Sequence, residues 1–113
     1  MPPCLFCKIA AKEIPARIVH EDKTCLAFHD IDPQAPVHLL VIPRQHLSSI
    51  QEADEASEPM LGHLHRIAAE LARQHQIAEG YRVVVNTGTS AGQSVFHLHL
   101  HVLGGRSFHW PPG

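Results

Sequence analysis

Three histidines alternate with apolar residues in the C-terminal part of this 113-residue chain. His97, His99 and His101 are separated by Leu98 and Leu100. On a β-strand, side chains two residues apart point to the same face, so this spacing predicts three imidazoles on one face and a buried aliphatic face opposite. The imidazole face suits chemistry, because near neutral pH an imidazole can be a nucleophile, a proton carrier or a metal ligand.

The residues alone leave three interpretations of this face. The first is a half-exposed strand without a chemical role, which is disfavoured because histidine is not a favoured strand residue and the preceding loop is rich in hydrogen-bond donors. The second is a metal site, for which two histidines one residue apart have the right reach. The third is an anion site, in which one imidazole attacks phosphorus while its neighbours donate hydrogen bonds to phosphate oxygens.

A second chemically active group lies near the N-terminus. Cys4 and Cys7 form a Cys-x-x-Cys motif, which is typical of redox pairs and of zinc ligands. A redox pair usually opens a helix after a strand, and the sequence before these residues predicts no such strand. Zinc would need two further ligands, for which His46 and His97 are available. The remaining alternative is two small residues without a metal.

The bulk composition excludes several classes of protein. The net charge of −2 with neutral histidines provides no polycation for nucleic acid or for a membrane surface. The longest apolar run, residues 39–42, is too short to span a bilayer, and no signal peptide is predicted. Three cysteines, an odd number, do not make a disulfide framework, and Cys25 is expected in a strand core. We therefore expect one cytoplasmic domain over residues 1–113.

Periodicity and turn residues predict an antiparallel α+β domain. A short helix is expected over residues 8–12, before Pro15. The histidine segment should form the last strand, and the strands expected before it are 17–21, 25–29, 38–43 and 81–86. The order β-β-β-α-β-β predicts one long helix packed on one face of the sheet.

The long helix is predicted from apolar residues at helical spacing. Its buried stripe consists of Leu61, Leu64, Ile67, Ala68, Leu71 and Ala72. Ser57 is expected to cap its N-terminus and Gly80 to stop it in a left-handed conformation. Ser48 and Gln51 predict a capped single turn before it. Three histidines fall off the stripe and are expected on the solvated surface: His63, His65 and His75.

The chain resembles the histidine-triad (HIT) family, whose signature is His-φ-His-φ-His-φ-φ, with φ an apolar residue. Residues 97–103 match that signature. Other segments are similar to the Hint branch of the family: 13–16, 26–31, 33–36, 40–43, 80–82, 84–86, 92–94 and 109–113. The resemblance implies a HIT-like fold, in which a five-stranded antiparallel sheet carries one long and one short helix. It also implies a homodimer across which the sheet continues.

The Hint resemblance implies a purine nucleoside phosphoramidase. Such an enzyme hydrolyses adenosine or guanosine 5′-monophosphoramidates to the nucleoside monophosphate and an amine, through a nucleotidyl-histidine intermediate. His99, the middle histidine, would be the nucleophile, with His38 and a backbone carbonyl orienting it. His101 would donate to a phosphate oxygen, Ser94 would assist the leaving amine or a non-bridging oxygen, and Asn86 would bind phosphate or the leaving group. The scheme requires no cofactor.

The resemblance also implies a purine nucleotide pocket, in which Asp30 accepts the ribose hydroxyls. Glycine at position 92 leaves room for backbone N–H groups to approach the anion. The predicted nucleotide-binding residues are Leu5, Phe6, Ile9, Phe28, His29, Asp30, Ile31, Leu40, Gly92, Gln93, Ser94, Val95, His99, His101 and Trp110. Residues 106–113 would form a tail that contributes to the dimer and to the substrate site. The alternative is a tail folded on its own domain.

Zinc-containing relatives use a cysteine pair, a histidine after an Ile-Pro-x-x-His stretch, and the first triad histidine. Cys4, Cys7, His46 and His97 match that pattern, which implies a closed structural zinc site. Three other functions stay open: a dinucleoside polyphosphate hydrolase of the Fhit branch, a non-catalytic nucleotide-binding regulatory protein, and zinc storage by the triad. The Trp-Pro-Pro-Gly tail and the Gly-Gln-Ser loop favour the Hint branch over Fhit.

Overall fold

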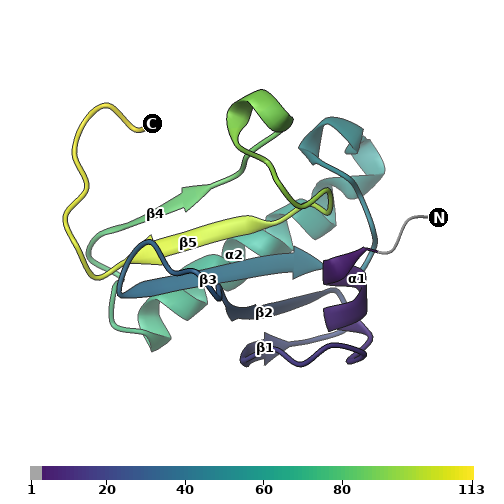
Figure 1. The fold of residues 1–113 in the computed structure, drawn as a ribbon, viewed down its shortest axis with the longest axis horizontal. Coiled ribbons are helices and arrows are strands. Elements are labelled where there is room, and N and C mark those ends of the chain that lie inside the picture. Colours follow the sequence, from purple (N-terminus) through teal and green to yellow (C-terminus); the bar gives the residue numbers. More distant parts are fainter. Residues whose placement is uncertain (1–3) are drawn as a thin grey trace.

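The computed structural model, which describes residues 4–113, has one five-stranded sheet with a short helix and a long helix (Figure 1). The helices are α1 (Leu5–Ala10) and α2 (Glu58–Gln74). The strands are β1 (Ile18–Glu21), β2 (Cys25–His29), β3 (Val37–Pro43), β4 (Tyr81–Val84) and β5 (Leu100–Gly104). They lie in the order β1-β2-β3-β5-β4, and every neighbouring pair is antiparallel. The predicted α+β fold class is confirmed.

The two faces of the sheet are covered by different helices. Buried residues of β2, β3 and β5 pack with the apolar stripe of α2 on one face. On the other face, Phe6 and Ile9 of α1 pack against the alternate residues of β2 and β3, which are Leu26, Phe28, Leu40 and Ile42. This division follows from the two-residue period of a strand. Cys25 is completely buried on the α2 side, as predicted.

The histidine segment forms a shorter strand than its alternation predicts. β5 begins at Leu100, so His101 lies in the strand while His97 and His99 precede it. The ladder with β3 ends at the Val41–Leu100 pair. Before this pair the backbone N–H of Leu98 donates to the Leu47 carbonyl instead. The alternation itself survives, because the aliphatic residues face α2 while His97 and His99 contact Phe6 of α1.

Both helices differ from their predicted limits. α1 begins at Leu5 rather than at residue 8, because Cys4 caps it by accepting a hydrogen bond from the Cys7 N–H. α2 ends at Gln74, and Gln76 rather than Gly80 adopts the left-handed conformation, with φ of 62°. The α2 stripe is buried as predicted, except that Leu61 is half-buried at its edge.

The serines predicted to cap the long helix and the short turn before it make other hydrogen bonds in the structure. Ser57 precedes α2, but its hydroxyl bonds to Asp54 and makes no cap bond with α2. Ser49, not Ser48, caps the short turn at Ile50–Glu52 by accepting from the Gln51 N–H. Ser48 is held by the Glu52 carboxylate instead. In each case neighbouring polar groups compete for the same hydroxyl.

The C-terminal tail lies beyond β4 (Figure 1) and is fastened there by one arginine. Arg82 of β4 donates to the carbonyls of His109 and Pro112. The Phe108 ring lies 5.0 Å from the Arg82 guanidinium and 4.2 Å from that of Arg106, within cation–π range. The Trp110 side chain is 87% exposed. The tail therefore packs partly on its own domain and leaves its tryptophan uncovered.

No helix in residues 4–113 is long and apolar enough to cross a membrane.

Candidate active site and metal cluster

A pocket of about 340 Å³ lies between α1 and the segment that carries His99. Five of its polar residues come from separate parts of the chain, except for two neighbouring histidines, and gather within it: Asp30, Asn86, Ser94, His99 and His101. The other lining residues are Leu5, Phe6, Ile9, Ile14, Pro15, Ala16, Phe28, His29, Ile31, Leu40, Gly92 and Val95. The pocket thus combines apolar walls with convergent polar groups, as ligand sites in proteins do.

His99 is oriented by the backbone two residues before it. Its Nδ1 lies 2.7 Å from the His97 carbonyl oxygen. Because a carbonyl only accepts, Nδ1 carries the proton and the neutral ring has its free lone pair on Nε2. Burial lowers the pKa of His99, an effect opposed by the bond to the His97 carbonyl and by the charge of Asp30. The ring is therefore held neutral, as a nucleophile requires.

A chain of hydrogen bonds fixes the proton of His101. The backbone N–H of Gln34 donates to Nδ1 of His38, at 3.0 Å, so the neutral His38 ring carries its proton on Nε2. That Nε2 lies 2.9 Å from Nδ1 of His101, which must accept. The His101 proton is consequently on Nε2, where it is a donor. Burial, together with His99 and His38, lowers the pKa of His101 to about 4.

The position of His38 corrects its predicted role. The sequence places it in the shell that orients His99, but its hydrogen bond is made to His101. The carbonyl of His97 is the group that orients His99, in line with the other half of that prediction. His38 is buried behind the pocket wall, and its Nε2 also lies 3.4 Å from the Asp30 carboxylate. His38 is thus a positioning residue for His101.

Two predicted nucleotide-binding residues lie away from the pocket lining. Gln93 is buried, and its amide bonds to the carbonyls of Ser48 and Val95 and to the Gly88 N–H. It therefore supports the loop rather than presenting a group to a ligand. Trp110 lies in the exposed tail and does not line the pocket of its own chain. The remaining predicted nucleotide-binding residues all line it.

Three lining residues were not predicted as part of the site: Ile14, Pro15 and Ala16. They follow α1 and belong to segment 13–16, which carries part of the family resemblance. Their residue types offered no chemical signal, because apolar side chains at a loop are equally typical of ordinary packing.

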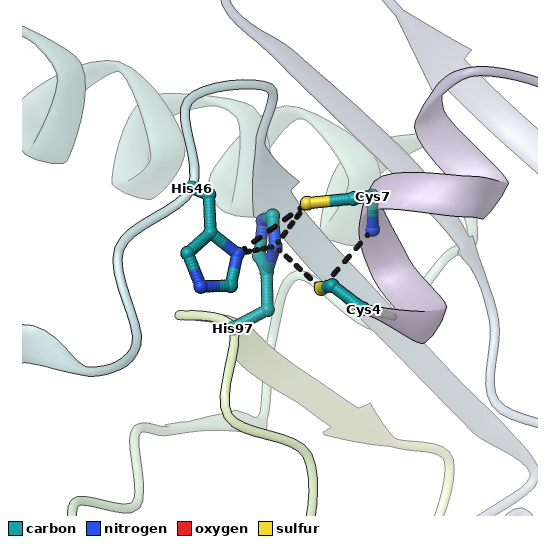
Figure 2. Close-up of side chains that lie close together, drawn as sticks. All are labelled: Cys4, Cys7, His46 and His97. Carbon is teal, nitrogen blue, oxygen red and sulfur yellow. Dashed lines mark hydrogen bonds between the residues drawn. The ribbon is translucent and has the colours of Figure 1, made fainter. Parts of the chain in front are cut away.

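Beside the pocket, Cys4, Cys7, His46 and His97 point toward one another (Figure 2). Nδ1 of His97 lies 3.3 Å from Sγ of Cys4, 3.5 Å from Sγ of Cys7 and 3.1 Å from Nδ1 of His46. The distance from Sγ of Cys7 to Nδ1 of His46 is 3.3 Å. The four ligand atoms therefore surround one point.

These distances fit a tetrahedral metal. Zinc bonds of about 2.3 Å to sulfur and about 2.0–2.1 Å to nitrogen place neighbouring ligand atoms about 3.3–3.8 Å apart. Nε2 of His97 donates to the Pro43 carbonyl, at 2.9 Å, so its Nδ1 presents a lone pair to the cluster. This ring-to-carbonyl bond is the usual support of a ligating histidine. The donor set and its spacing thus suit zinc.

The redox interpretation of the cysteine pair is disfavoured by its surroundings. Burial and the neighbouring Cys4 raise the pKa of the Cys7 thiol to about 11. Reactive thiols have a lowered pKa, because the thiolate is the nucleophile. In the absence of a cation, Cys7 therefore stays protonated and unreactive near neutral pH.

Comparison with known proteins gives concordant matches. The family described as the HIT domain matches residues 11–108. An uncharacterized HIT-like protein of Synechococcus elongatus is 54% identical over 109 residues, which cover 96% of each chain. The crystal structure of a HIT family hydrolase from Legionella pneumophila superposes with a TM-score of 0.96 at 50% identity, covering 98% of this chain and 100% of that one. A histidine triad nucleotide-binding protein of Candida albicans gives 0.84 at 29%, covering 98% and 85%.

Proposed function

The chain belongs to the HIT domain family and has the fold of its hydrolases, and we propose that it is a purine nucleoside phosphoramidase. The reaction would convert an adenosine or guanosine 5′-monophosphoramidate into the nucleoside monophosphate and an amine. The observation that carries this proposal is the free Nε2 of His99, held neutral in a pocket beside a second histidine that presents an N–H. A nucleophile and a donor for phosphate oxygens are thereby placed together.

The first chemical step is attack of His99 Nε2 on the α-phosphorus. A phosphorus–nitrogen bond to the histidine forms while the bond to the amine breaks, and the departing amine takes up a proton. Ser94 lines the pocket and is the hydroxyl proposed to donate to the leaving nitrogen. The Nε2–H of His101 would donate to a non-bridging oxygen, where negative charge increases in the transition state.

In the second step, water attacks the phosphorus of the nucleotidyl-histidine, the bond to His99 breaks, and the proton that the water loses replaces the one taken up by the amine. His99 leaves as a neutral imidazole, because its Nδ1 keeps the proton that it donates to the His97 carbonyl. Asn86, which also lines the pocket, is placed to bind the phosphate or the leaving group. Each step uses groups of this chain, and the scheme requires no cofactor.

The nucleoside would occupy the apolar part of the pocket. Asp30 is the proposed acceptor for the ribose hydroxyls; its Oδ1 is held by the Asp32 N–H at 2.8 Å. Ile31, beside it, lines the pocket yet is 99% exposed, so a bound purine could cover it. Phe6 and Phe28, which also line the pocket, pack edge to face with ring centroids 5.5 Å apart. These walls support a flat, apolar base as the ligand.

We also propose that Cys4, Cys7, His46 and His97 hold a structural zinc ion, supported by the tetrahedral spacing of their ligand atoms. Such an ion would fix α1 to the segment before β5, and it takes no part in the phosphoryl chemistry. A cytoplasmic homodimer is the proposed assembly. In it, the sheet continues across the interface and residues 106–113 reach the partner's site, a role for which the exposed Trp110 is suited.

The proposal is tested by assaying the purified chain with adenosine 5′-phosphoramidate, diadenosine polyphosphates and AMP. Preferred turnover of the phosphoramidate, lost in His99→Ala, supports the proposed reaction. Preferred turnover of the dinucleotides would assign the alternative polyphosphate hydrolysis. Tight AMP binding without turnover of either substrate would leave a nucleotide-binding regulatory protein. Zinc bound by all three triad histidines and released by AMP would indicate the storage function.

A further inference from the structure

A third group of chemically active side chains lies on the α2 side of the sheet, opposite the pocket. Its centre is Oδ2 of Asp22, in the turn between β1 and β2. Nε2 of His20 lies 2.8 Å from this oxygen and Nε2 of His63, on α2, lies 2.7 Å from it. Sγ of Cys25 lies 3.5 Å away. Three segments of the chain therefore converge on one carboxylate oxygen.

A β-bulge directs His20 into this group. In the β1–β2 ladder Ile18 pairs with Phe28 and His20 pairs with Ala27, so Val19 is an extra residue. Paired residues share a face, and Ala27 packs on the α2 side. Without the extra residue, alternation would place His20 on the other face. Bulges recur where a side chain must be re-aimed for a function.

The carboxylate is fixed and ionised. Oδ1 accepts the backbone N–H groups of Thr24 and Cys25, at 2.7 and 2.8 Å, which leaves Oδ2 for the imidazoles. Partial burial tends to raise the pKa of Asp22, but the hydrogen bonds from His20 and His63 hold it well below its usual range. The side chains of His20, Asp22 and His63 are 23%, 28% and 26% exposed, so ions in solution can reach them.

We propose that His20, Asp22 and His63 form a binding site for a divalent transition-metal ion, distinct from the cysteine-containing cluster. Two imidazole nitrogens and one carboxylate oxygen suit Ni²⁺, Cu²⁺ or Zn²⁺, with water completing the shell. The two nitrogens lie 2.8 and 2.7 Å from Oδ2, so a bound ion would take the place of these two hydrogen bonds.

Metal binding at this site requires no release of a proton. Each neutral imidazole moves its proton from Nε2, now bound to the metal, to Nδ1. The charge of Asp22 offsets one of the two positive charges of the ion. Arg44 donates to the Asp22 carbonyl, and its guanidinium also lies 3.6 Å from the Glu21 carboxylate, which offsets its charge.

Cys25 is not a ligand of this site. Its thiol donates to Oδ2 and the residue is completely buried, away from the solvent from which an ion would enter. The site differs in this from the cluster of Cys4 and Cys7: it offers harder ligands and stays open to solvent. It should accordingly bind more weakly and exchange its ion.

The test is calorimetric titration of Ni²⁺ into the full chain loaded with one equivalent of zinc, which the tighter cysteine-containing cluster takes up first. We expect one nickel ion per chain at this site, and at least a tenfold loss of affinity in His63→Gln. Glutamine keeps an N–H donor for Asp22 but removes the imidazole lone pair, so a purely structural hydrogen bond would survive. His65→Gln is the matched control, because His65 is exposed on the same helix and bonds only to its own turn.

His20→Gln repeats the test from β1, so the proposal stays testable if His63→Gln fails to fold. Nickel should raise the melting temperature of the wild type and of His65→Gln. It should not change the melting temperature of His20→Gln or of His63→Gln. Equal nickel affinity in the wild type and in folded His20→Gln or His63→Gln would overturn the proposal. Binding that survives in both and disappears in His101→Gln would place the ion in the pocket, and would overturn it as well.

Discussion

His97 and His99 are two residues apart, and each donates a ring proton to a backbone carbonyl, yet their free nitrogens meet opposite surroundings. His97 donates through Nε2 to Pro43 and turns Nδ1 toward two thiols and another imidazole. His99 donates through Nδ1 to His97 and has Nε2 free at the pocket, beside His101. The first arrangement collects lone pairs around one point, and the second combines one lone pair with donors.

The difference shows that the backbone acceptor, rather than the residue type, decides what each histidine can do. Lone pairs around a common point suit a cation, whereas a lone pair beside an N–H suits a phosphate that must be attacked and held. His97 belongs to both regions, because its ring lies in the cysteine cluster and its carbonyl orients His99. The cysteine-containing cluster and the proposed nucleophile are therefore linked through His97, two residues before His99.

The largest expected effect comes from His99→Ala. We expect the hydrolysis rate of adenosine 5′-phosphoramidate to fall about 10⁴-fold or more, because the attacking nitrogen is lost. Affinity for AMP should stay within about tenfold, because the walls of the pocket remain. Steady-state kinetics and calorimetric titration measure the two quantities. Turnover within tenfold of the wild type would contradict the assignment of His99 as the nucleophile.

The next largest effect concerns the cysteine-containing cluster, which is expected to contribute to stability rather than to catalysis. His46→Gln should abolish stoichiometric zinc and lower the free energy of unfolding by about 4 kcal/mol, the stabilisation expected at a thousandfold excess of zinc over Kd. Zinc content by mass spectrometry and denaturant unfolding in zinc buffer check this. His65→Gln, which removes an exposed histidine of α2, is the control and should leave both unchanged. A wild type that binds no zinc would contradict the metal assignment.

A pH series tests the anion-binding side of the comparison. His101 has its pKa lowered to about 4, against about 6.5 for an unfolded chain, so between these values the unfolded state binds the additional proton. Stability is therefore lost as pH falls from 7 to 5, by about 1–2 kcal/mol from this residue. His101→Gln should show a correspondingly shallower loss in denaturant unfolding. Parallel curves for the two proteins would contradict a buried neutral His101.

The smallest effect concerns the tail. Arg82→Ala removes the donor that holds the His109 and Pro112 carbonyls, so it should free Trp110 from its present position. We expect a change of a few-fold in the ratio of kcat/KM between large and small leaving amines, with little change in stability. Arg66→Ala, which breaks an exposed ion pair on α2, is the control. An unchanged ratio would exclude a role of the tail in leaving-group choice.

The sequence predicted the sheet and the buried stripe well, because both depend on periodicity. β2 has the predicted limits, and the alternation around the triad correctly divides aliphatic residues from imidazoles. Where the chain left the sheet, periodicity was insufficient. Strand β5 begins only at Leu100, because the backbone before it pairs with a loop: the Leu98 N–H donates to the Leu47 carbonyl. No local pattern reveals this partner.

The candidate site was predictable as a set of residues and not as a set of contacts. Most predicted pocket residues do line the pocket, but His38 contacts His101 and Gln93 supports a loop. Those outcomes depend on the Gln34 N–H and the Ser48 carbonyl, backbone groups that every residue possesses. The convergence of His20 and His63 on Asp22 depends on a bulge, which is likewise absent from the two-residue pattern.

Covalent catalysis by His99 can be tested by mass spectrometry of the intact protein, quenched under mildly basic conditions during turnover of adenosine 5′-phosphoramidate. We expect an adenylyl adduct in the wild type, located on His99 by peptide mapping and absent from His99→Ala. An adduct on another residue, or one that persists in His99→Ala, would contradict it.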